Sequence, residues 1–217
     1  WNACFRALWH YSRAQVADFL KAIEYAELAI DMEQGMGLPW AVKAACLSDM
    51  QILQLNDKDD DLVEMGKKAV SLAPKDPMTR ALMGQVYFAA KNITGASSEY
   101  KTAIDLNPLL PFAWFGLGWI EVWERNNYQV GREAILESLD LDPNGPQNGR
   151  KYVALAGSYL GEGKLEQAED AIEKSLLSNV NWPASVIQAS IKAQLGQVET
   201  GNSIIKTVMK NIEAPVE

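Results

Sequence analysis

The sequence predicts an all-α solenoid, in which antiparallel pairs of helices stack one behind the other along the chain. The clearest pair is residues 78–108, MTRALMGQVYFAAKNITGASSEYKTAIDLNP, which contains two helical patterns joined by a short turn. Gly84 on the first pattern and Ala96 on the second permit a close crossing, because neither carries a bulky side chain. We expect Tyr87 and Tyr100 to fill the space toward the neighbouring pairs. This spacing is that of one helical hairpin.

The same small positions recur at nearly constant intervals, which is the second observation behind the predicted fold. Gly84 and Gly118 are 34 residues apart, Pro74 and Pro108 are also 34 apart, and Gly118 and Ala156 are 38 apart. A single hairpin cannot bury its apolar face alone, so units of this kind stack on their neighbours. We expect one domain over residues 1–217, with five to six hairpins at about residues 1–34, 38–74, 77–108, 111–143, 149–180 and 183–213.

The first two hairpins depart most from a regular turn. In the first, residues 1–13 form a helix with one apolar face, and the turn that follows is expected to be lengthened. Gly35 and Gly37 are expected to end the second helix, because Gln34 stands where a closing proline would be. In the second hairpin, the stretch LNDKDDD at residues 55–61 makes the turn about six residues longer than standard.

The remaining hairpins keep the register to different degrees. The third and the fifth match it best, and the sixth, with Ala189 at its small position, matches it least. In the fourth, Trp114 and Gly118 mark the first helix, while Gly131 and the closing Pro143 mark the second. Proline cannot continue a helix, so Pro143 sets the end of this hairpin.

Composition excludes several classes of protein. The chain has 217 residues, of which 48% are hydrophobic and 22% charged, so it can bury a sizeable core. Its net charge of −8, with scattered basic residues, argues against nucleic acid or an anionic membrane as a partner. No apolar run reaches the roughly 18 residues of a membrane helix, and we expect a cytoplasmic location. Because the chain begins at Trp1 without methionine or signal peptide, we interpret it as a piece of a longer protein.

These motifs resemble the tetratricopeptide repeat family over nearly the whole chain. The resemblance implies a right-handed superhelix whose first helices line a concave inner surface. More narrowly, the phrases ALWHYSR, KAIEYAELAIDM, YKTAIDLNP and KAQLGQVETG resemble a repeat region of two kinds of bacterial regulator. These are the class III adenylate/guanylate cyclases and the winged-helix transcriptional activators, in which the repeats follow an effector domain. No cyclase or DNA-binding motif occurs in this sequence, so the resemblance implies a regulatory role only.

The register also predicts which side chains line the inner surface. The candidate partner-binding residues are Gln85 and Phe88 in the third hairpin and Phe112, Phe115, Trp119 and Trp123 in the fourth. The fourth hairpin stands out, because four aromatic residues share one stripe and exposed aromatic clusters are common where partners dock. Gly157 and Gly161 on the next inner helix predict an open pocket beside these rings.

Two interpretations of the aromatic stripe stay open, because aromatic residues at helical spacing are also what a packed core requires. Tetratricopeptide domains that grip a terminal carboxylate use Lys, Arg and Asn at the inner positions, where this chain has mostly apolar or small residues. The resemblance therefore implies a hydrophobic or amphipathic segment in the groove. That segment would come from another protein, a second copy of this chain, or the effector domain.

Other chemistries have little support in the sequence. Asp57, Asp59 and Asp61 are spaced like the start of a calcium loop, but Leu62 replaces the required glycine and Lys68 replaces the final Glu. We therefore interpret this stretch as a solvated acidic loop.

The other candidate residues are expected to be structural. His10 is the only histidine, so no His-based metal cluster or catalytic dyad can form within the chain. Cys4 and Cys46 lie in apolar helical patterns and are expected to be buried hydrophobes. Glu121 and Glu124 are expected to be solvated charges or a small acidic patch. Residues 161–164, GEGK, lack the phosphate-loop pattern and are interpreted as a turn between helices, and we expect no metal or cofactor.

The sequence thus predicts a non-catalytic protein-interaction module, the regulatory region of a bacterial signalling or transcription protein. A partner segment would dock along the inner face, centred on Phe115, Trp119 and Trp123. The alternative is a homo-oligomerisation module of a multidomain regulator such as an adenylate cyclase. An enzyme would need convergent titratable residues in a pocket, and the sequence offers none.

Overall fold

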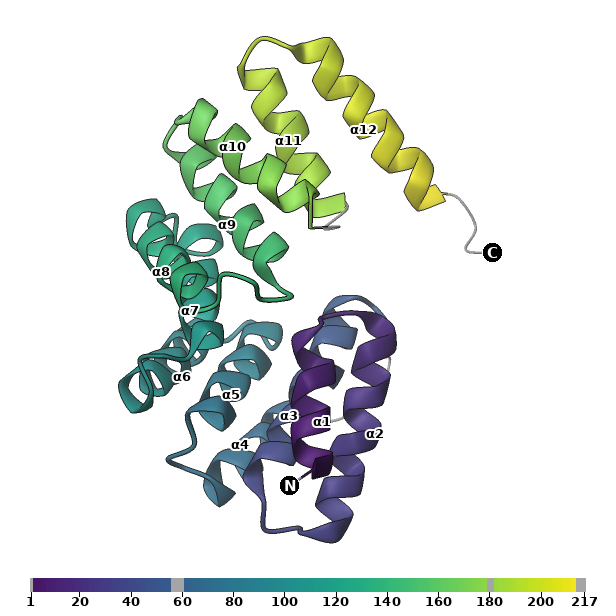
Figure 1. Ribbon diagram of the computed structural model, residues 1–217, viewed down its shortest axis with the longest axis vertical. Helices are drawn as coiled ribbons and strands as arrows, with labels where there is room; N and C mark the ends of the chain where they lie inside the picture. Colours follow the sequence, from purple (N-terminus) through teal and green to yellow (C-terminus); the bar gives the residue numbers. More distant parts are fainter. Residues whose placement is uncertain (1, 56–60, 179–181, 214–217) are drawn as a thin grey trace. The chain divides into compact units, whose positions relative to one another are not determined.

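The computed structural model describes residues 2–55, 61–178 and 182–213, and within these ranges it contains twelve α-helices and no strand (Figure 1). The helices are α1 (Asn2–Ser12), α2 (Val16–Met32), α3 (Gly37–Ile52), α4 (Leu62–Leu72), α5 (Pro77–Ala89), α6 (Ile93–Leu106), α7 (Pro111–Trp123), α8 (Tyr128–Leu141), α9 (Asn148–Gly161), α10 (Leu165–Leu176), α11 (Trp182–Gln194) and α12 (Val198–Glu213). Taken in pairs, the described helices form helical hairpins, so the predicted all-α hairpin architecture is confirmed.

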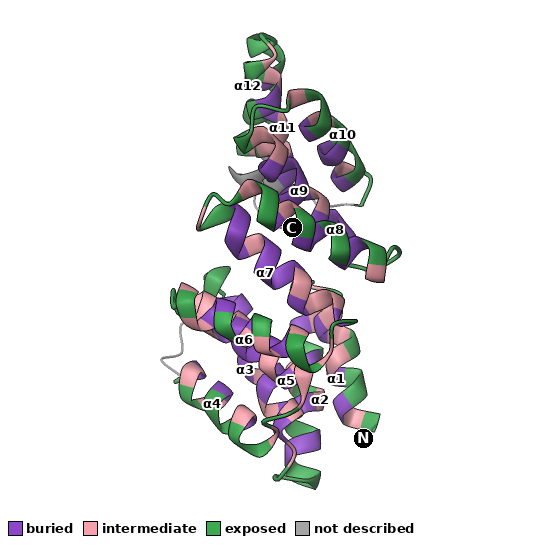
Figure 2. Cartoon of the chain, turned by 90° about the vertical axis from the view of Figure 1, so that its left-hand side faces the viewer, coloured by how far each residue is buried: buried purple, intermediate pink, exposed green. Residues whose placement is uncertain are grey.

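The helices gather into two compact units, Trp1–Leu117 and Gly118–Glu217, and the boundary falls within α7. In the first unit, α3 packs against α1, α2, α4 and α5. Its core contains the buried side chains of Phe19, Val42, Leu82 and Met83. In the second unit, α9 packs against α8, α10 and α11 around a core that includes Ile172. Figure 2 shows that buried residues alternate with exposed ones along single helices, as each helix packs on one side.

Small residues do allow the helices to cross closely, as the sequence predicts. In the second unit, a Cβ atom added at Gly118 would lie 2.7 Å from Cγ1 of Ile135 and 2.9 Å from the carbonyl oxygen of Gly131. A Cβ atom at Gly131 would lie 2.6 Å from Cγ2 of Val122. Helices α7 and α8 therefore touch through their backbones at this crossing.

The equivalent crossing of the third hairpin contains a tyrosine. A Cβ atom at Gly84 would lie 2.9 Å from Cε1 of Tyr100, so the ring occupies the space that the glycine leaves. The ring also lies against Gly116, where a Cβ atom would be 2.3 Å from its Cζ atom. The sequence reasoning missed Gly116, because its register assigned the small position of this helix to Gly118 alone.

A hydrogen bond repeats where one hairpin follows another. The indole Nε1 of Trp114 donates to the carbonyl of Pro108 at 2.8 Å, and Nε of Arg80 donates to the carbonyl of Pro74 at 3.0 Å. Trp40 bonds in the same way, at 3.4 Å, to the carbonyl six positions before it. That carbonyl belongs to Gln34, the residue in the place of the closing proline. The contact explains why glutamine fits there, since only its backbone oxygen is used.

The first hairpin differs from the prediction of a lengthened turn. Only three residues separate α1 from α2, and the additional residues extend α2 to 17 residues. Neither glycine nor proline occurs within α2, so nothing interrupts the helix. The predicted glycine stop is also wrong for Gly37, which is the first residue of α3. A Cβ atom there would lie 2.4 Å from the carbonyl oxygen of Ala69, so Gly37 serves a close contact with α4.

In the second hairpin the long acidic turn lies between α3 and α4, and residues 56–60 are outside the described part of the chain. Asp57 and Asp59 of the calcium-like spacing belong to that range. Asp61 is the N-cap of α4, where its carboxylate accepts a hydrogen bond from the backbone N–H of Glu64 at 3.0 Å. A side-chain acceptor at this position satisfies an N–H group that the helix leaves unpaired. Asp61 thus has a local structural role.

Among the described residues, each hairpin turn has one in the left-handed region. These residues are Ala14, Gln54, Lys91, Asn126, Gly163 and Gly196, with φ between 51° and 79°. The N–H that follows Gly163 returns to the carbonyl of Tyr159, five residues earlier, at 2.9 Å, and the turn after Lys91 has the same bond. This is the Schellman closure of a helix end, which favours glycine at the left-handed position.

Replacing Gly163 by alanine is expected to lower the free energy of unfolding by about 1 kcal/mol. No heavy atom lies within 4 Å of the position that the new Cβ would take, so the loss comes from backbone conformation alone. Urea unfolding followed by circular dichroism measures it. Lys91→Gly is the matched control, because it places glycine in the same conformation and should cost little. Equal losses in both variants would contradict this account.

Candidate functional site

The two candidate residues on α5 take part in contacts within the first unit. Nε2 of Gln85 donates to Oδ1 of Asp49 at 2.6 Å, and the Tyr100 hydroxyl donates to Oε1 of Gln85 at 3.2 Å. Both ends of the Gln85 amide therefore join neighbouring helices. Phe88 is half-buried, and Nζ of Lys91 lies 5.8 Å from the centre of its ring. Gln85 thus links α3, α5 and α6.

The two phenylalanines of α7 pack into the first unit. The Phe112 ring is edge-on to Tyr11 and to Tyr100, with ring centres 5.9 and 6.3 Å apart. Phe115 is only 5% exposed. Edge-to-face pairs of this kind stabilise a core beyond their buried area. The sequence analysis placed Phe115 at the centre of the groove. Because it is buried, Phe115 has little surface with which to contact a partner.

The two tryptophans of α7 belong to the second unit, and only Trp123 is exposed. Their ring centres are 5.9 Å apart with planes tilted by 53°. Trp123 is 39% exposed, whereas Trp119 is half-buried. The guanidinium of Arg150 on α9 lies 5.8 Å from the centre of the Trp119 ring, within the range of a cation–π contact. We call Trp119, Trp123 and Arg150 the tryptophan surface.

The predicted open pocket beside the rings is not formed. A Cβ atom at Gly157 would lie 2.4 Å from Cη2 of Trp123, so the indole itself occupies that space. A Cβ atom at Gly161 would lie 2.3 Å from Cζ of Tyr128, which fills the second space. The glycines let two aromatic rings lie directly on the backbone of α9. This packing fixes the orientation of the Trp123 ring while leaving part of it exposed.

Glu121 is buried, which corrects the expectation of a solvated charge. Its Oε1 atom accepts a hydrogen bond from Arg125, and its Oε2 atom accepts one from Nδ2 of Asn127 at 2.8 Å. The backbone N–H of Asn127 also donates to the Glu121 carbonyl at 2.8 Å. Glu121 therefore holds the turn between α7 and α8, directly after the tryptophan surface. The sequence spacing carried a signal, since Arg125 lies four residues after Glu121.

A buried lysine in the second unit was not foreseen from the sequence. Nζ of Lys151 donates to the carbonyl of Ser138 at 3.0 Å and lies 3.9 Å from Oδ2 of Asp142. Burial lowers the pKa of Lys151, and the nearby Asp142 opposes that shift. The side chain fastens α9 to the end of α8, close to Arg150 of the tryptophan surface.

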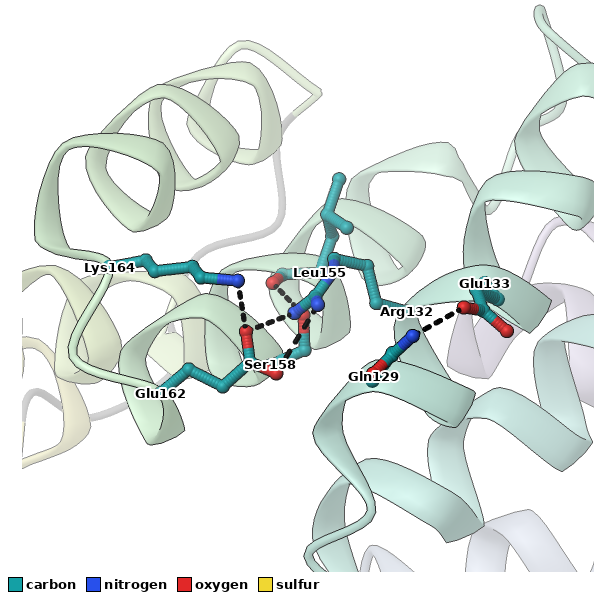
Figure 3. Close-up of polar contacts among 7 residues, drawn as sticks. All are labelled: Gln129, Arg132, Glu133, Leu155, Ser158, Glu162 and Lys164. Carbon is teal, nitrogen blue, oxygen red and sulfur yellow. Dashed lines mark hydrogen bonds and ion pairs between the residues drawn. The ribbon is translucent and has the colours of Figure 1, made fainter.

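An ion-pair cluster joins α8 to the end of α9 (Figure 3). The guanidinium of Arg132 donates to both carboxylate oxygens of Glu162, at 2.7 and 3.2 Å, and Nζ of Lys164 lies 2.7 Å from the same carboxylate. Hydrogen bonds from Arg132, and then from Lys164, lower the pKa of Glu162 below its ordinary value. Arg132 also lies over the Tyr159 ring at 5.0 Å. A bidentate ion pair of this kind fixes the orientation of both side chains in addition to pairing their charges.

Replacing Glu162 by glutamine is expected to destabilise the protein at pH 7 and to have a smaller effect at low pH. Because the folded-state pKa of Glu162 is lowered, its stabilising contribution is present above the unfolded-state pKa and is lost as the pH falls through the folded-state pKa. The difference in unfolding midpoint between wild type and Glu162→Gln, measured from pH 7 down to pH 3, tests this. A difference independent of pH would contradict it.

His10 and the two cysteines have structural surroundings in the first unit. Nδ1 of His10 lies 2.7 Å from Oδ1 of Asp18, and the contact with His10, followed by that with Arg13, lowers the pKa of Asp18. Cys4 and Cys46 are free and buried, and burial raises the pKa of both thiols. Among the residues that the structure describes, no group of three or more His, Cys, Asp or Glu side chains could hold a metal ion. No described helix is long and apolar enough to cross a membrane.

Comparisons with known proteins bear on the fold. Neither a family model nor a curated protein sequence matches this chain. Among solved structures, it is similar to TTC0263, a thermophilic tetratricopeptide protein of Thermus thermophilus, with 16% identity and a TM-score of 0.65 over 89% of this chain and 97% of that one. It is also similar to PilW, a type IV pilus biogenesis factor, with 17% identity and a TM-score of 0.69 over 98% and 94% of the two chains.

A third similar structure is a chain of the APC/C hetero-tetramer Cut9–Hcn1, with 16% identity and a TM-score of 0.73. The match covers 90% of this chain and 38% of that one. At such low identity these likenesses show the fold alone. Together with the six hairpins and their glycine crossings, they show that this chain has an all-α helical-repeat fold of the tetratricopeptide type.

Proposed function

We propose that this chain is a non-catalytic protein-interaction scaffold, whose tryptophan surface binds an extended or helical segment of a partner protein. The observation that carries the proposal is the Trp123 ring, which is held against Gly157 of α9 yet remains 39% exposed. Tryptophan and arginine dominate the energetics of protein interfaces. Because the ring is already held in place, a partner would immobilise few side chains on binding.

The proposed surface is narrower than the stripe that the sequence suggested. Phe112 and Phe115 pack into the first unit, and the amide of Gln85 is hydrogen-bonded at both ends. Trp119 and Trp123 therefore remain as the apolar part of the surface, with Arg150 as its charged part. A segment with an apolar side chain for the indoles and a carboxylate for Arg150 fits this arrangement.

The setting that we propose is regulatory and cytoplasmic. The phrases ALWHYSR and YKTAIDLNP, which resemble repeats behind bacterial effector domains, support a role in a bacterial signalling or transcription protein. Among the structurally similar proteins, one belongs to a hetero-tetramer of Cut9 with Hcn1, which is an assembly of two different proteins. Its fold is thus compatible with binding another chain.

The test uses peptides selected on the wild-type chain from a random 16-residue display library. Trp123→Ala is expected to raise the Kd of the selected peptides at least ten-fold, in keeping with about 2 kcal/mol for an interface hot spot. Fluorescence anisotropy gives the Kd, and circular dichroism checks that helicity is kept. Leu109→Ala, which removes an exposed apolar side chain of the other unit, is the control. Unchanged affinity in both Trp119→Ala and Trp123→Ala would remove this function.

Self-association is a second candidate, because the last helix has an exposed apolar stripe. Val198, Ile205 and Met209 lie on one face of α12 and are all exposed, as is most of this helix (Figure 2). Such a stripe fits against a second copy of the same helix. Sedimentation velocity over a range of concentrations decides this candidate. A monomer at every concentration excludes it, and dimers that disappear in Ile205→Glu support it.

A further inference from the structure

An exposed face of α1 combines aromatic rings with arginines. Phe5 and Trp9 are 60% and 56% exposed, and they are one helical turn apart. Arg6, within α1, and Arg13, the first residue after the helix ends, are also exposed. We call Phe5, Arg6, Trp9 and Arg13 the N-terminal face. It belongs to the first unit, whereas the tryptophan surface belongs to the second.

Both guanidinium groups of this face are held on aromatic rings. The Arg13 guanidinium lies 5.0 Å from the centre of the Trp9 ring, and the Arg6 guanidinium lies 5.5 Å from that of Tyr25. The Tyr25 ring is in turn stacked on His10, with ring centres 5.5 Å apart. A stacked guanidinium is planar and already oriented, so it loses less conformational freedom when it binds a carboxylate.

Each arginine keeps donor groups beyond its internal contacts. Nε of Arg13 donates to Asp18 at 3.0 Å, and the Arg13 side chain is still 49% exposed. One terminal nitrogen of Arg6 is 3.4 Å from the Tyr25 hydroxyl. For the other N–H groups of Arg6 and Arg13, the described part of the chain shows no acceptor. An arginine has five donors, so each can still bind a carboxylate.

The charge of this face is opposite to that of the whole chain. Residues 2–13 contain two arginines and no Asp or Glu, although the chain carries a net charge of −8. The nearby carboxylate of Asp18 is already bound by His10 and Arg13. A surface that is locally positive and apolar calls for an occupant that is acidic and apolar.

We propose that the N-terminal face docks an acidic amphipathic helix of another protein. Apolar side chains of that helix would cover Phe5 and Trp9, while carboxylates would pair with Arg6 and Arg13. Arg6 lies in α1 and Arg13 is the first residue after the end of this helix, so about 10 Å separates the two positions at 1.5 Å per helical residue. Carboxylates at positions i and i+7 of the docked helix, with an apolar residue one turn from each, match this spacing. The site is separate from the tryptophan surface.

The test uses two fluorescein-labelled helical peptides of 18 residues that share one leucine stripe. One carries Glu at positions i and i+7 beside the stripe, and the other carries Lys at the same positions. We expect the Glu peptide to bind at least ten-fold more tightly than the Lys peptide, and to weaken as salt rises. Arg6→Ala and Arg13→Ala should each raise the Kd of the Glu peptide about ten-fold, because each variant loses a charge-assisted hydrogen bond. Equal binding of the two peptides would overturn the proposal.

Matched variants separate recognition from folding. Arg132→Ala removes an arginine that also lies over an aromatic ring, that of Tyr159, but belongs to neither proposed binding surface, and it should leave Glu-peptide binding unchanged. Because Arg13→Ala also removes a partner of Asp18, Arg13→Lys is measured beside it and should weaken binding while keeping the charge. If Arg132→Ala weakened Glu-peptide binding as much as Arg6→Ala does, the assignment of the binding site to the N-terminal face would be contradicted.

The same experiment also distinguishes two other possible binding partners of the N-terminal face. Dimers in sedimentation velocity that Arg6→Glu abolishes, without Glu-peptide binding, would overturn the proposal in favour of a second copy. Binding to phosphatidylserine vesicles that depends on Arg6 and Arg13, without Glu-peptide binding, would overturn it in favour of a lipid surface. Glu-peptide binding that is lost in Trp9→Ala and kept in Trp123→Ala supports it.

Discussion

Replacing Tyr100 by alanine is expected to lower the free energy of unfolding by about 4 kcal/mol, within the usual range for a buried aromatic side chain. The side chain is only 2% exposed and is among the largest that the first unit buries. Its ring lies against the backbone of both Gly84 and Gly116 and is edge-on to Phe112. Neither glycine has a side chain that could move into the cavity. Urea unfolding followed by circular dichroism measures the loss.

Tyr100→Phe separates the ring from its hydroxyl group. The hydroxyl donates to Oε1 of Gln85 at 3.2 Å, and a hydrogen bond of this kind contributes about 1 kcal/mol. We expect the phenylalanine variant to lose only that amount, because the ring still fills the space beside Gly84. A similar loss in both variants would mean that the hydroxyl, and not the ring, stabilises the third hairpin.

Gly118→Val is expected to destabilise the protein by about 3 kcal/mol, as overpacking of a tight core does. The added Cβ would lie 2.9 Å from the carbonyl oxygen of Gly131 and 2.7 Å from Ile135. Backbone atoms of α8 cannot swing aside, so α7 and α8 would have to separate. Hydrogen exchange of the second unit should rise together with the loss of stability, because these two helices pack through this crossing.

Gly157→Val is the matched comparison, since it adds the same side chain, but at a close contact with an aromatic ring. There the obstructing atom is Cη2 of Trp123, at the far end of a side chain that is 39% exposed. The ring can turn outward, so we expect a smaller loss than for Gly118→Val, with a red shift of tryptophan fluorescence. If the two variants lost equal stability, backbone contact would not be the reason for glycine at position 118.

Much of the fold could be predicted because its determinants are local. The small residues Gly84 and Gly118 follow from spacing along the chain, and the structure places them in close contact with Tyr100 and Ile135. Helix ends were harder to predict, since Gly37 looked like a helix stop but starts α3. The period of the repeat determines which positions of a helix face the other helix of its hairpin and the hairpins before and after it.

The candidate site could be predicted less well. The sequence identified the aromatic stripe of α7, but it could not divide the stripe into a packed part and an exposed part. Phe112 meets Tyr11, about a hundred positions earlier in the chain, and no periodic pattern encodes that contact. The burial of Glu121 and Lys151 was also missed, because charged residues usually remain in water.

The sequence by itself determined that helical hairpins repeat and that small residues lie at their crossings, because two helices approach closely only where neither carries a bulky side chain. Tertiary structure alone decided that Trp123 lies on Gly157 with part of its ring exposed, and that Arg13 lies over Trp9. How far a side chain is exposed depends on the atoms of neighbouring helices that cover it. Those atoms belong to residues far away in the sequence, so the local spacing pattern does not predict them.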